Sequence, residues 1–204
     1  MTVSISPHAN DFGAAITGVD LSQALDEATR SAIRQAWLQH QVVYFPDQPM
    51  SYAQLEQFSL SVGPFGNDPY VQAIDGHEHI VEVRREPDED VPLFGGTWHS
   101  DWSFQAEPPN ATLLHAKIIP PVGGGTHYAD GVRAFEHLDP GLARDVESLQ
   151  AVHSARKPYS PEGVKAGGGD RRSMTLLPSE TALLTQRHPL VRTHPETGRR
   201  ALWV

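Results

Sequence analysis

The chain has 204 residues, with 16 lysine and arginine residues against 25 aspartate and glutamate residues, which gives a net charge of -9 at pH 7. This acidic balance argues against a nucleic-acid groove, because phosphate binding depends on clustered lysine and arginine side chains. The sequence contains no cysteine. Disulfide bridges and thiolate metal ligands are therefore excluded, and any metal must be bound by histidine, aspartate or glutamate.

Hydrophobic residues make up 39% of the chain, and the 17 glycine and 17 proline residues indicate many turns. This composition predicts a single globular domain over residues 1–204 with a loop-rich, mainly β architecture. The N-terminus lacks the basic and apolar regions of a signal peptide, and no apolar run is long enough to span a bilayer. We therefore expect a cytoplasmic protein without a membrane or nucleic-acid partner.

The first part of the chain predicts a helix followed by a short strand. Apolar residues at helical spacing, including Ile33 and Trp37, indicate an amphipathic helix over about residues 22–40. The apolar run at 42–45 then predicts a buried strand.

A capping-box pattern marks the next helix, because Ser51 is followed three residues later by Gln54. This helix is expected to end at Gly63. After it, a strand is predicted at 79–83, and the acidic run at 86–90 is expected to be a solvated loop rather than a calcium site, since it lacks calcium-loop spacing.

The second half of the chain predicts strands at 112–119 and 126–130 and a helix over about residues 132–150. Residues 156–175 are rich in proline, glycine and basic side chains, which predicts a mobile loop. Loops of this length are uncommon and often have a function. Its triple glycine at 167–169 lacks the lysine and hydroxyl of a phosphate-binding loop. A strand, a turn and a final strand are expected over 188–204.

Residues 95–104, GGTWHSDWSF, contain the most informative motif, His99-Ser100-Asp101. Side chains two positions apart leave the same face of a strand, so His99 and Asp101 can bind one metal ion while Ser100 points away. Such a pair supplies two of the three ligands of a 2-His-1-carboxylate triad, which leaves open positions on ferrous iron. The preceding glycines allow close backbone approach to a ligand, and the surrounding aromatic residues form either a dry wall or part of the core.

On these motifs, the chain resembles the taurine dioxygenase family of iron(II)- and 2-oxoglutarate-dependent oxygenases, which also contains enzymes that act on alkyl sulfates and aryloxyacetates. The resemblance runs through nearly the entire chain and is more specific than a single His-x-Asp motif. The ordered matches are residues 18–22 (GVDLS), 41–48 (QVVYFPDQ), 98–101 (WHSD), 108–109 (PP), 123–126 (GGGT) and 191–198 (VRTHPETG).

The resemblance implies a double-stranded β-helix, or jelly roll, flanked by helices, with iron at one mouth of the barrel. His99 and Asp101 match the first two iron ligands, and Thr126 matches the hydroxyl that binds the distal carboxylate of 2-oxoglutarate. The implied cofactors are Fe(II), 2-oxoglutarate as cosubstrate and O2. The implied reaction is hydroxylation of a small anionic organic substrate with release of succinate and CO2.

In the family, a further histidine ligand and an arginine for 2-oxoglutarate follow the turn that matches residues 193–198. The chain ends before these positions, so we expect a C-terminally incomplete copy whose last barrel strands are missing and whose exposed strand edges favour aggregation or pairing with a second copy. His188 and His194 match the structural turn segment instead. His115 and His127 are expected to be strand residues that line or flank the barrel.

Three residues are candidate substrate contacts: Tyr70, Gly95 and Trp98. Tyr70, Ala73 and Gly95 occupy positions where taurine-specific members carry polar substrate-contacting side chains, which implies a substrate other than taurine. Glycine at position 95 and the aromatic side chain of Trp98 predict room for a larger or less polar anion, of the sulfonate, alkyl sulfate or aryloxyacetate class.

Two other classes of function remain open. A metal-dependent hydrolase also uses histidine and aspartate ligands, with metal-bound water as the nucleophile. Alternatively, the chain is a non-catalytic fragment or binding module without a third metal ligand. Iron-dependent formation of succinate from 2-oxoglutarate distinguishes an oxygenase from both.

Overall fold

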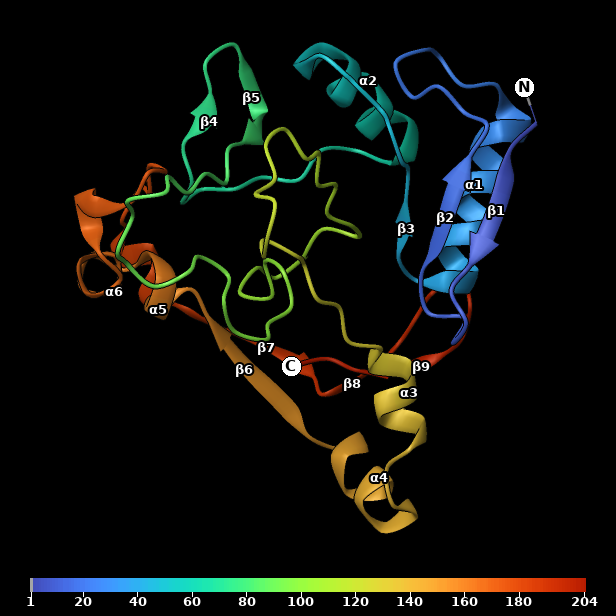
Figure 1. Ribbon diagram of the computed structural model, residues 1–204. Helices are drawn as coiled ribbons and strands as arrows, with labels where there is room; N and C mark the ends of the chain where they lie inside the picture. The colour runs from blue at the N-terminus through green and yellow to red at the C-terminus, as the bar shows by residue number, and fades with distance from the viewer. Residues whose placement is uncertain (1) are drawn as a thin grey trace. The chain divides into compact units, whose positions relative to one another are not determined.

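The computed structural model describes residues 2–204, and its helices and strands gather into two compact units. Each unit is built from several segments of the chain, which Figure 1 colours by residue number. The first unit contains residues 2–65, 113–137 and 193–201, and the second contains residues 66–112, 138–192 and 202–204.

The first unit combines a small sheet with helices. Its elements are β1 (Ser4–Pro7), β2 (Ala14–Thr17), α1 (Glu27–His40), β3 (Val43–Tyr44), α2 (Tyr52–Val62) and α3 (Gly131–Glu136). Strand β1 is antiparallel to β2, and β2 is parallel to β3. Helix α1 packs beside β2 (Figure 1). Ile16 in β2 and Ala36 in α1 are buried, so the apolar face of the helix and the sheet share a core.

Helix α1 begins five residues later than predicted, at Glu27 rather than near residue 22. Asp20 accepts hydrogen bonds from the backbone N–H and hydroxyl of Ser22 at 2.9 and 2.6 Å, which closes a separate turn. The helix is capped instead by Asp26, which accepts from the backbone N–H of Thr29 at 2.7 Å. The Ser22 and Thr29 hydrogen bonds are the main reason that the pKa values of Asp20 and Asp26 lie below their ordinary value.

The capping box predicted at the start of α2 is confirmed. The backbone N–H of Ser51 donates to Oε1 of Gln54 at 2.8 Å, and the backbone N–H of Gln54 donates to Oγ of Ser51 at 3.3 Å. Two donors that the helix start leaves without helical partners are thereby satisfied. The helix ends at Gly63, also as predicted.

The second unit contains short strands and short helices. Its elements are β4 (Ala73–Ile74), β5 (His77–Val81), α4 (Pro140–Glu147), β6 (Gln150–Ser154), α5 (Arg156–Tyr159), α6 (Pro161–Ala166), the 3-10 helices η1 (Gly169–Arg171) and η2 (Glu180–Leu183), and β7 (Thr185–Pro189). Strand β4 pairs with β5 and β6 pairs with β7, both antiparallel. The last two strands of the chain, β8 (Val191–Thr193) and β9 (Arg200–Leu202), have residues in both units and pair around the predicted turn.

Aromatic side chains form the core of the second unit. The ring of Tyr70 stacks on Tyr159 with a centroid distance of 4.9 Å and an interplanar angle of 22°. Phe94 and Phe104 pack against the same Tyr159 ring at 6.2 and 6.0 Å. Burial raises the pKa of the Tyr159 phenol, and the nearby carboxylate of Asp68 adds to this rise. Tyr159 is therefore a neutral packing residue at ordinary pH.

Two predicted strands are wrong. Residues 112–119 and 126–130 lie outside every strand that the structure describes in residues 2–204. His115 and Lys117 instead bond through their side chains to backbone carbonyl oxygens of the segment before α2, at 3.1 and 2.7 Å. These side-chain hydrogen bonds, rather than pairing with a neighbouring strand, hold residues 115–117 in place.

Two further predictions need correction. The helix predicted over 132–150 is split into α3 and α4, because Asp139 caps α4 and Pro140 cannot continue a preceding helix. The loop predicted over 156–175 contains α5, α6 and η1. Helix α6 begins where Oγ of Ser160 accepts from the backbone N–H of Gly163 at 3.0 Å, with proline next in the chain.

The sheets are small. The described residues 2–204 form one three-stranded sheet and three two-stranded sheets, together with helices. The arrangement is mixed α and β, and the jelly roll and the single domain over residues 1–204 stay predictions. No helix within residues 2–204 has both the length and the apolar character needed to cross a membrane.

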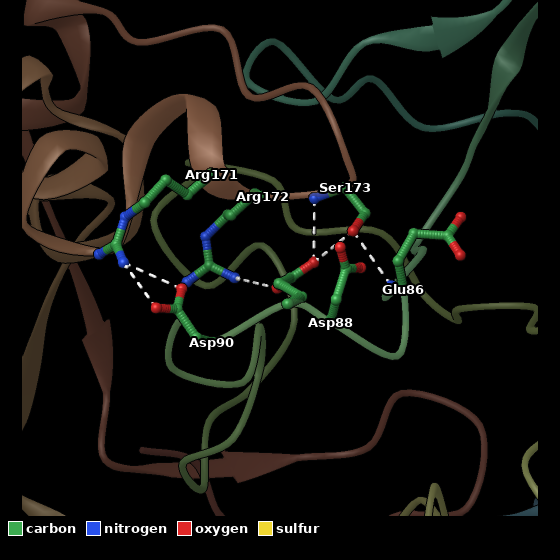
Figure 2. Close-up of a pocket in the computed structure, with 7 residues that line it drawn as sticks. Glu86, Asp88, Asp90, Arg171, Arg172 and Ser173 are labelled. Carbon is green, nitrogen blue, oxygen red and sulfur yellow. Dashed lines mark hydrogen bonds and ion pairs between the residues drawn. The ribbon is translucent and has the colours of Figure 1, made fainter.

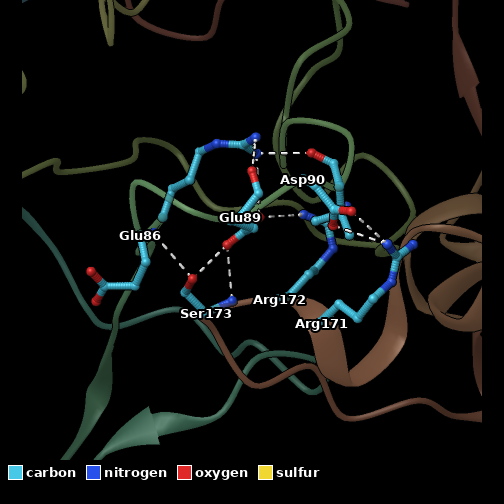
Figure 3. Close-up of polar contacts among 8 residues, drawn as sticks. Glu86, Glu89, Asp90, Arg171, Arg172 and Ser173 are labelled. Atoms are coloured by element: carbon cyan, nitrogen blue, oxygen red, sulfur yellow. Dashed lines mark hydrogen bonds and ion pairs between the residues drawn. The ribbon is translucent and has the colours of Figure 1, made fainter.

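The acidic residues 86–90 form a loop, as predicted, but the loop is not simply solvated. The side chain of Glu89 is only 3% exposed. Its carboxylate accepts hydrogen bonds from the backbone N–H and hydroxyl of Ser173 at 2.9 and 2.6 Å (Figure 3). Oγ of Ser173 in turn accepts from the backbone N–H of Glu86 at 3.0 Å. One buried carboxylate thus joins two segments that are distant in sequence.

A surface cavity of about 450 Å³ lies at this junction, lined by Glu86, Asp88, Glu89, Asp90, Arg171, Arg172 and Ser173. Figure 2 shows Arg171 facing Asp90, to whose carboxylate oxygens it donates at 2.9 and 3.1 Å. Ligand cavities are mostly apolar with a few polar groups. Here both arginines pair with carboxylates of the lining, Arg171 with Asp90 and Arg172 with Glu89, so the cavity is a structural junction. It shares no residue with the His99–Asp101 pair.

Replacing Ser51 with alanine should lower the free energy of unfolding by about 1 kcal/mol, because the backbone N–H of Gln54 loses its capping acceptor. Urea denaturation followed by circular dichroism measures the change. Ser51→Thr keeps a capping hydroxyl and serves as the control. Equal stability of Ser51→Ala and the wild type would contradict the capping role.

Replacing Glu89 with glutamine should lower the free energy of unfolding at neutral pH. The free energy that remains should change less with pH between pH 7 and pH 3. The hydroxyl of Ser173 holds the pKa of Glu89 below its ordinary value in the folded protein. This contribution is therefore present above the pKa of the unfolded chain and is lost as the pH falls through the folded pKa.

The measurement is urea denaturation of both proteins between pH 7 and pH 3. The difference between wild type and Glu89→Gln should be largest at pH 7 and should shrink on acidification. Glu78→Gln, which removes a carboxylate that is 87% exposed, is the control. A difference that stays constant with pH would rule out the charged form of Glu89 as its source.

Candidate functional site

The His99–Asp101 pair lies in a turn of the second unit rather than on the strand that its spacing suggests. Residues 97–104 contain no strand, and Trp102 has a φ of 47°. The two side chains nevertheless meet, with 3.1 Å between Nε2 of His99 and Oδ1 of Asp101. The turn brings the predicted ligands together by a different backbone geometry.

This separation fits two ligands of one metal ion. Two atoms that each lie about 2.1 Å from an ion, at right angles to each other, are about 3.0 Å apart. The observed 3.1 Å between Nε2 and Oδ1 matches that value. The side chains are 51% and 45% exposed, which leaves an open face for further ligands.

The protonation pattern of His99 also suits a ligand. Its Nδ1 lies 2.7 Å from the backbone carbonyl oxygen of Thr97. Because a carbonyl oxygen only accepts, Nδ1 must carry a proton, so a neutral His99 bound to a metal would offer its lone pair at Nε2, the atom that faces Asp101. Hydrogen bonds of this kind orient metal-binding histidines.

Asp101 is held in a corresponding way. Its Oδ2 accepts a hydrogen bond from the hydroxyl of Thr112 at 2.7 Å, which leaves Oδ1 directed at His99. Sequence reasoning missed Thr112, which stands 11 residues from Asp101 in a segment predicted to be a strand. A hydroxyl residue there carries no recognisable signal in a single sequence.

Thr126, the predicted 2-oxoglutarate contact, belongs to the first unit. It is exposed and follows the glycine turn at 123–125, in which Gly123 and Gly124 have φ values of 81° and 71°. Glycine suits these positions because L side chains rarely adopt positive φ. The hydroxyl of Thr126 is thus accessible, and its role stays a prediction.

The three candidate substrate contacts have different surroundings. Tyr70 is 5% exposed, stacks on Tyr159 and lies 3.2 Å from the hydroxyl of Thr181, so the structure shows a core role for it. Gly95 has a φ of 66°, and a Cβ there would lie 3.6 Å from Cε1 of His99. Trp98 is 73% exposed. The missing side chain of Gly95 therefore leaves space beside the His99 ring, and Trp98, next to His99 in sequence, presents an exposed aromatic surface.

The other histidines have structural partners. Nε2 of His188 lies 2.9 Å from the carbonyl oxygen of Gln105, and its ring packs on Trp203. Nδ1 of His194 accepts from the backbone N–H groups of the turn at residues 196 and 197. His115 and His127 are outside the strands described for residues 2–204. Within those residues, no group of three or more histidine, aspartate or glutamate side chains could hold a metal ion.

Comparison with known proteins connects this geometry to a family. Residues 4–204 match the family described as "Taurine catabolism dioxygenase TauD, TfdA family". An (S)-phenoxypropionate/alpha-ketoglutarate-dioxygenase of Sphingobium herbicidovorans is 32% identical over 98% of this chain and 69% of its own length. An alkylsulfatase of Acinetobacter baylyi is 32% identical over 94% of this chain and 59% of its own length.

A solved structure of a taurine dioxygenase from Burkholderia xenovorans is similar to the whole of this chain, with a TM-score of 0.77 and 29% sequence identity. The chain covers 63% of that protein, and thus spans about 59 to 69% of the length of these three similar proteins. The match over residues 4–204 places the chain in the TauD, TfdA family of taurine catabolism dioxygenases.

Proposed function

We propose that the protein is an Fe(II)- and 2-oxoglutarate-dependent dioxygenase that hydroxylates a small anionic organic substrate. The observation that carries this proposal is the convergence of Nε2 of His99 and Oδ1 of Asp101 at 3.1 Å in a member of this family. Both residues occupy the His-x-Asp positions expected for iron ligands. We further propose that the chain is one domain of the double-stranded β-helix class, which its similarity to the taurine dioxygenase supports.

The residues of the chain have separate tasks in this reaction. His99 and Asp101 would bind Fe(II) through Nε2 and Oδ1, while the Thr97 carbonyl holds the imidazole in the required tautomer. Thr126 would donate its hydroxyl to the distal carboxylate of 2-oxoglutarate. When bound, iron, 2-oxoglutarate and O2 supply the oxidising chemistry, with succinate and CO2 as products of the cosubstrate.

The substrate class follows from the open side of the pair and from the relatives. The relatives include the (S)-phenoxypropionate dioxygenase described above and proteins named for sulfate esters and sulfonates, all of which are organic anions. Gly95 leaves the space beside the His99 ring free of a side chain, and Trp98 offers an exposed aromatic surface. We propose an anion of the sulfonate, alkyl sulfate or aryloxyacetate class as the substrate.

The direct test mixes the purified full-length protein with Fe(II) and 2-oxoglutarate under nitrogen and records the visible absorption spectrum. A weak visible band should form only when both are present. On exposure to air, a panel of an aryloxyacetate, an alkyl sulfate and taurine should show which substrate stimulates succinate formation. Substrate hydrolysis without consumption of 2-oxoglutarate would favour a metal-dependent hydrolase, and absence of both band and turnover would overturn the dioxygenase proposal.

Replacing His99 or Asp101 with alanine in the complete protein should abolish Fe(II) binding, because each change removes one of the two converging ligand atoms. Anaerobic titration with Fe(II) measures the loss. His137→Ala and Asp145→Ala remove the same side-chain types at exposed positions and should bind iron like the wild type. Wild-type iron affinity in His99→Ala or Asp101→Ala would exclude them as ligands.

Replacing Thr126 with alanine should weaken 2-oxoglutarate binding by about 1 to 3 kcal/mol, the usual cost of leaving a polar partner unpaired. Iron binding should be unchanged. Calorimetric titration of the iron-loaded protein with 2-oxoglutarate measures the effect, and Thr126→Ser, which keeps the hydroxyl, should restore affinity. Loss of iron together with 2-oxoglutarate in Thr126→Ala would contradict a role limited to the cosubstrate.

A further inference from the structure

The hydroxyl of Thr112 makes a short hydrogen bond to the candidate metal ligand Asp101. Its Oγ1 lies 2.7 Å from Oδ2 of Asp101, and both residues belong to the second unit. The ionised carboxylate can only accept, so the threonine donates. Bonds from a hydroxyl to a carboxylate are among the stronger hydrogen bonds because the acceptor is charged.

This bond makes the two oxygens of Asp101 unequal. Oδ2 is occupied by Thr112, whereas Oδ1 lies 3.1 Å from Nε2 of His99. A carboxylate whose second oxygen is engaged by the protein presents one oxygen to a metal ion. The remaining coordination positions then stay available for other ligands.

The position of Thr112 on the surface makes its hydroxyl important for this geometry. The Asp101 side chain is 45% exposed, so few packing contacts restrict rotation of its carboxylate. Thr112 is itself exposed, so it adds little to the core. Its hydrogen bond is therefore a local restraint on the direction of the carboxylate.

We propose that Thr112 is a positioning residue of the metal site, which fixes Asp101 so that it binds the ion through Oδ1 alone. The proposal rests on the proposed function, because it assumes that His99 and Asp101 are the ligands. Thr112 does not touch the metal in this account. It acts on Asp101 as the Thr97 carbonyl acts on His99.

The test measures Co(II) binding to the metal-free protein, with Co(II) as a redox-stable substitute for Fe(II). Thr112→Val keeps the shape of the side chain but removes the donor, and should weaken Co(II) affinity by about 10- to 100-fold, the usual effect of losing such a partner. Thr112→Ser keeps the donor and should restore affinity to near the wild-type value. Thr185→Val, at an exposed threonine at the start of β7, is the matched control and should bind as the wild type does.

Thermal unfolding of the metal-free proteins separates positioning from folding. Thr112→Val should unfold at the wild-type temperature, because an exposed residue is changed and the defect is confined to metal binding. Wild-type Co(II) affinity in Thr112→Val, or an equal loss of Co(II) affinity in Thr112→Val and Thr112→Ser, would overturn the positioning role of Thr112. Neither result would by itself overturn the proposed function. Failure of the wild-type protein to bind Co(II) and Fe(II) would overturn the proposed function as well.

Discussion

The hydrogen bond between Nδ1 of His99 and the carbonyl oxygen of Thr97 is the constraint on which the candidate site depends. A neutral imidazole has one N–H, and its engagement at Nδ1 leaves Nε2 as the only lone pair available to an ion. The carbonyl points correctly because the backbone turns sharply before it. Gly96 lies so close to Leu93 that an added Cβ would meet the Leu93 Cβ at 3.0 Å. The ligand pair is therefore set by a tight turn and not by the regular pleat of a strand.

Aromatic packing holds this turn at both ends. Phe94 precedes it and Phe104 follows it, and both rings pack against Tyr159, at 6.2 and 6.0 Å. The guanidinium of Arg172 lies 6.0 Å from the Phe94 ring. The next residue, Ser173, donates a hydrogen bond to the buried carboxylate of Glu89. The middle of the turn, including His99 and Asp101, is exposed, while Phe94 and Phe104 at its two ends pack against the core. Such an arrangement suits a site that must be both open to ligands and preorganised.

Local sequence signals predicted the parts of the fold that depend on neighbouring residues. The capping box at Ser51 and the meeting of His99 with Asp101 each need only a few adjacent positions. Pairing of distant strands does not follow from such signals, which is why residues 112–119 read as a strand but are anchored by side chains. The helices within 156–175 were not predicted, because the proline and glycine content of this segment indicated a loop and the helix cap at Ser160 was not considered. Thr112 reaches Asp101 only through tertiary structure.

Glycine at position 95 connects the geometry of the turn with the space beside the His99 ring. Its φ of 66° is unfavourable for L side chains, so a backbone requirement alone favours glycine. A Cβ at the same position would lie 3.6 Å from Cε1 of His99, so any longer side chain would extend along the imidazole ring. Glycine at this position thus allows the turn that precedes Thr97 and also keeps the space beside the His99 ring free of a side chain. Because both effects follow from the missing Cβ, a larger residue here would strain the turn and fill the space beside the His99 ring together.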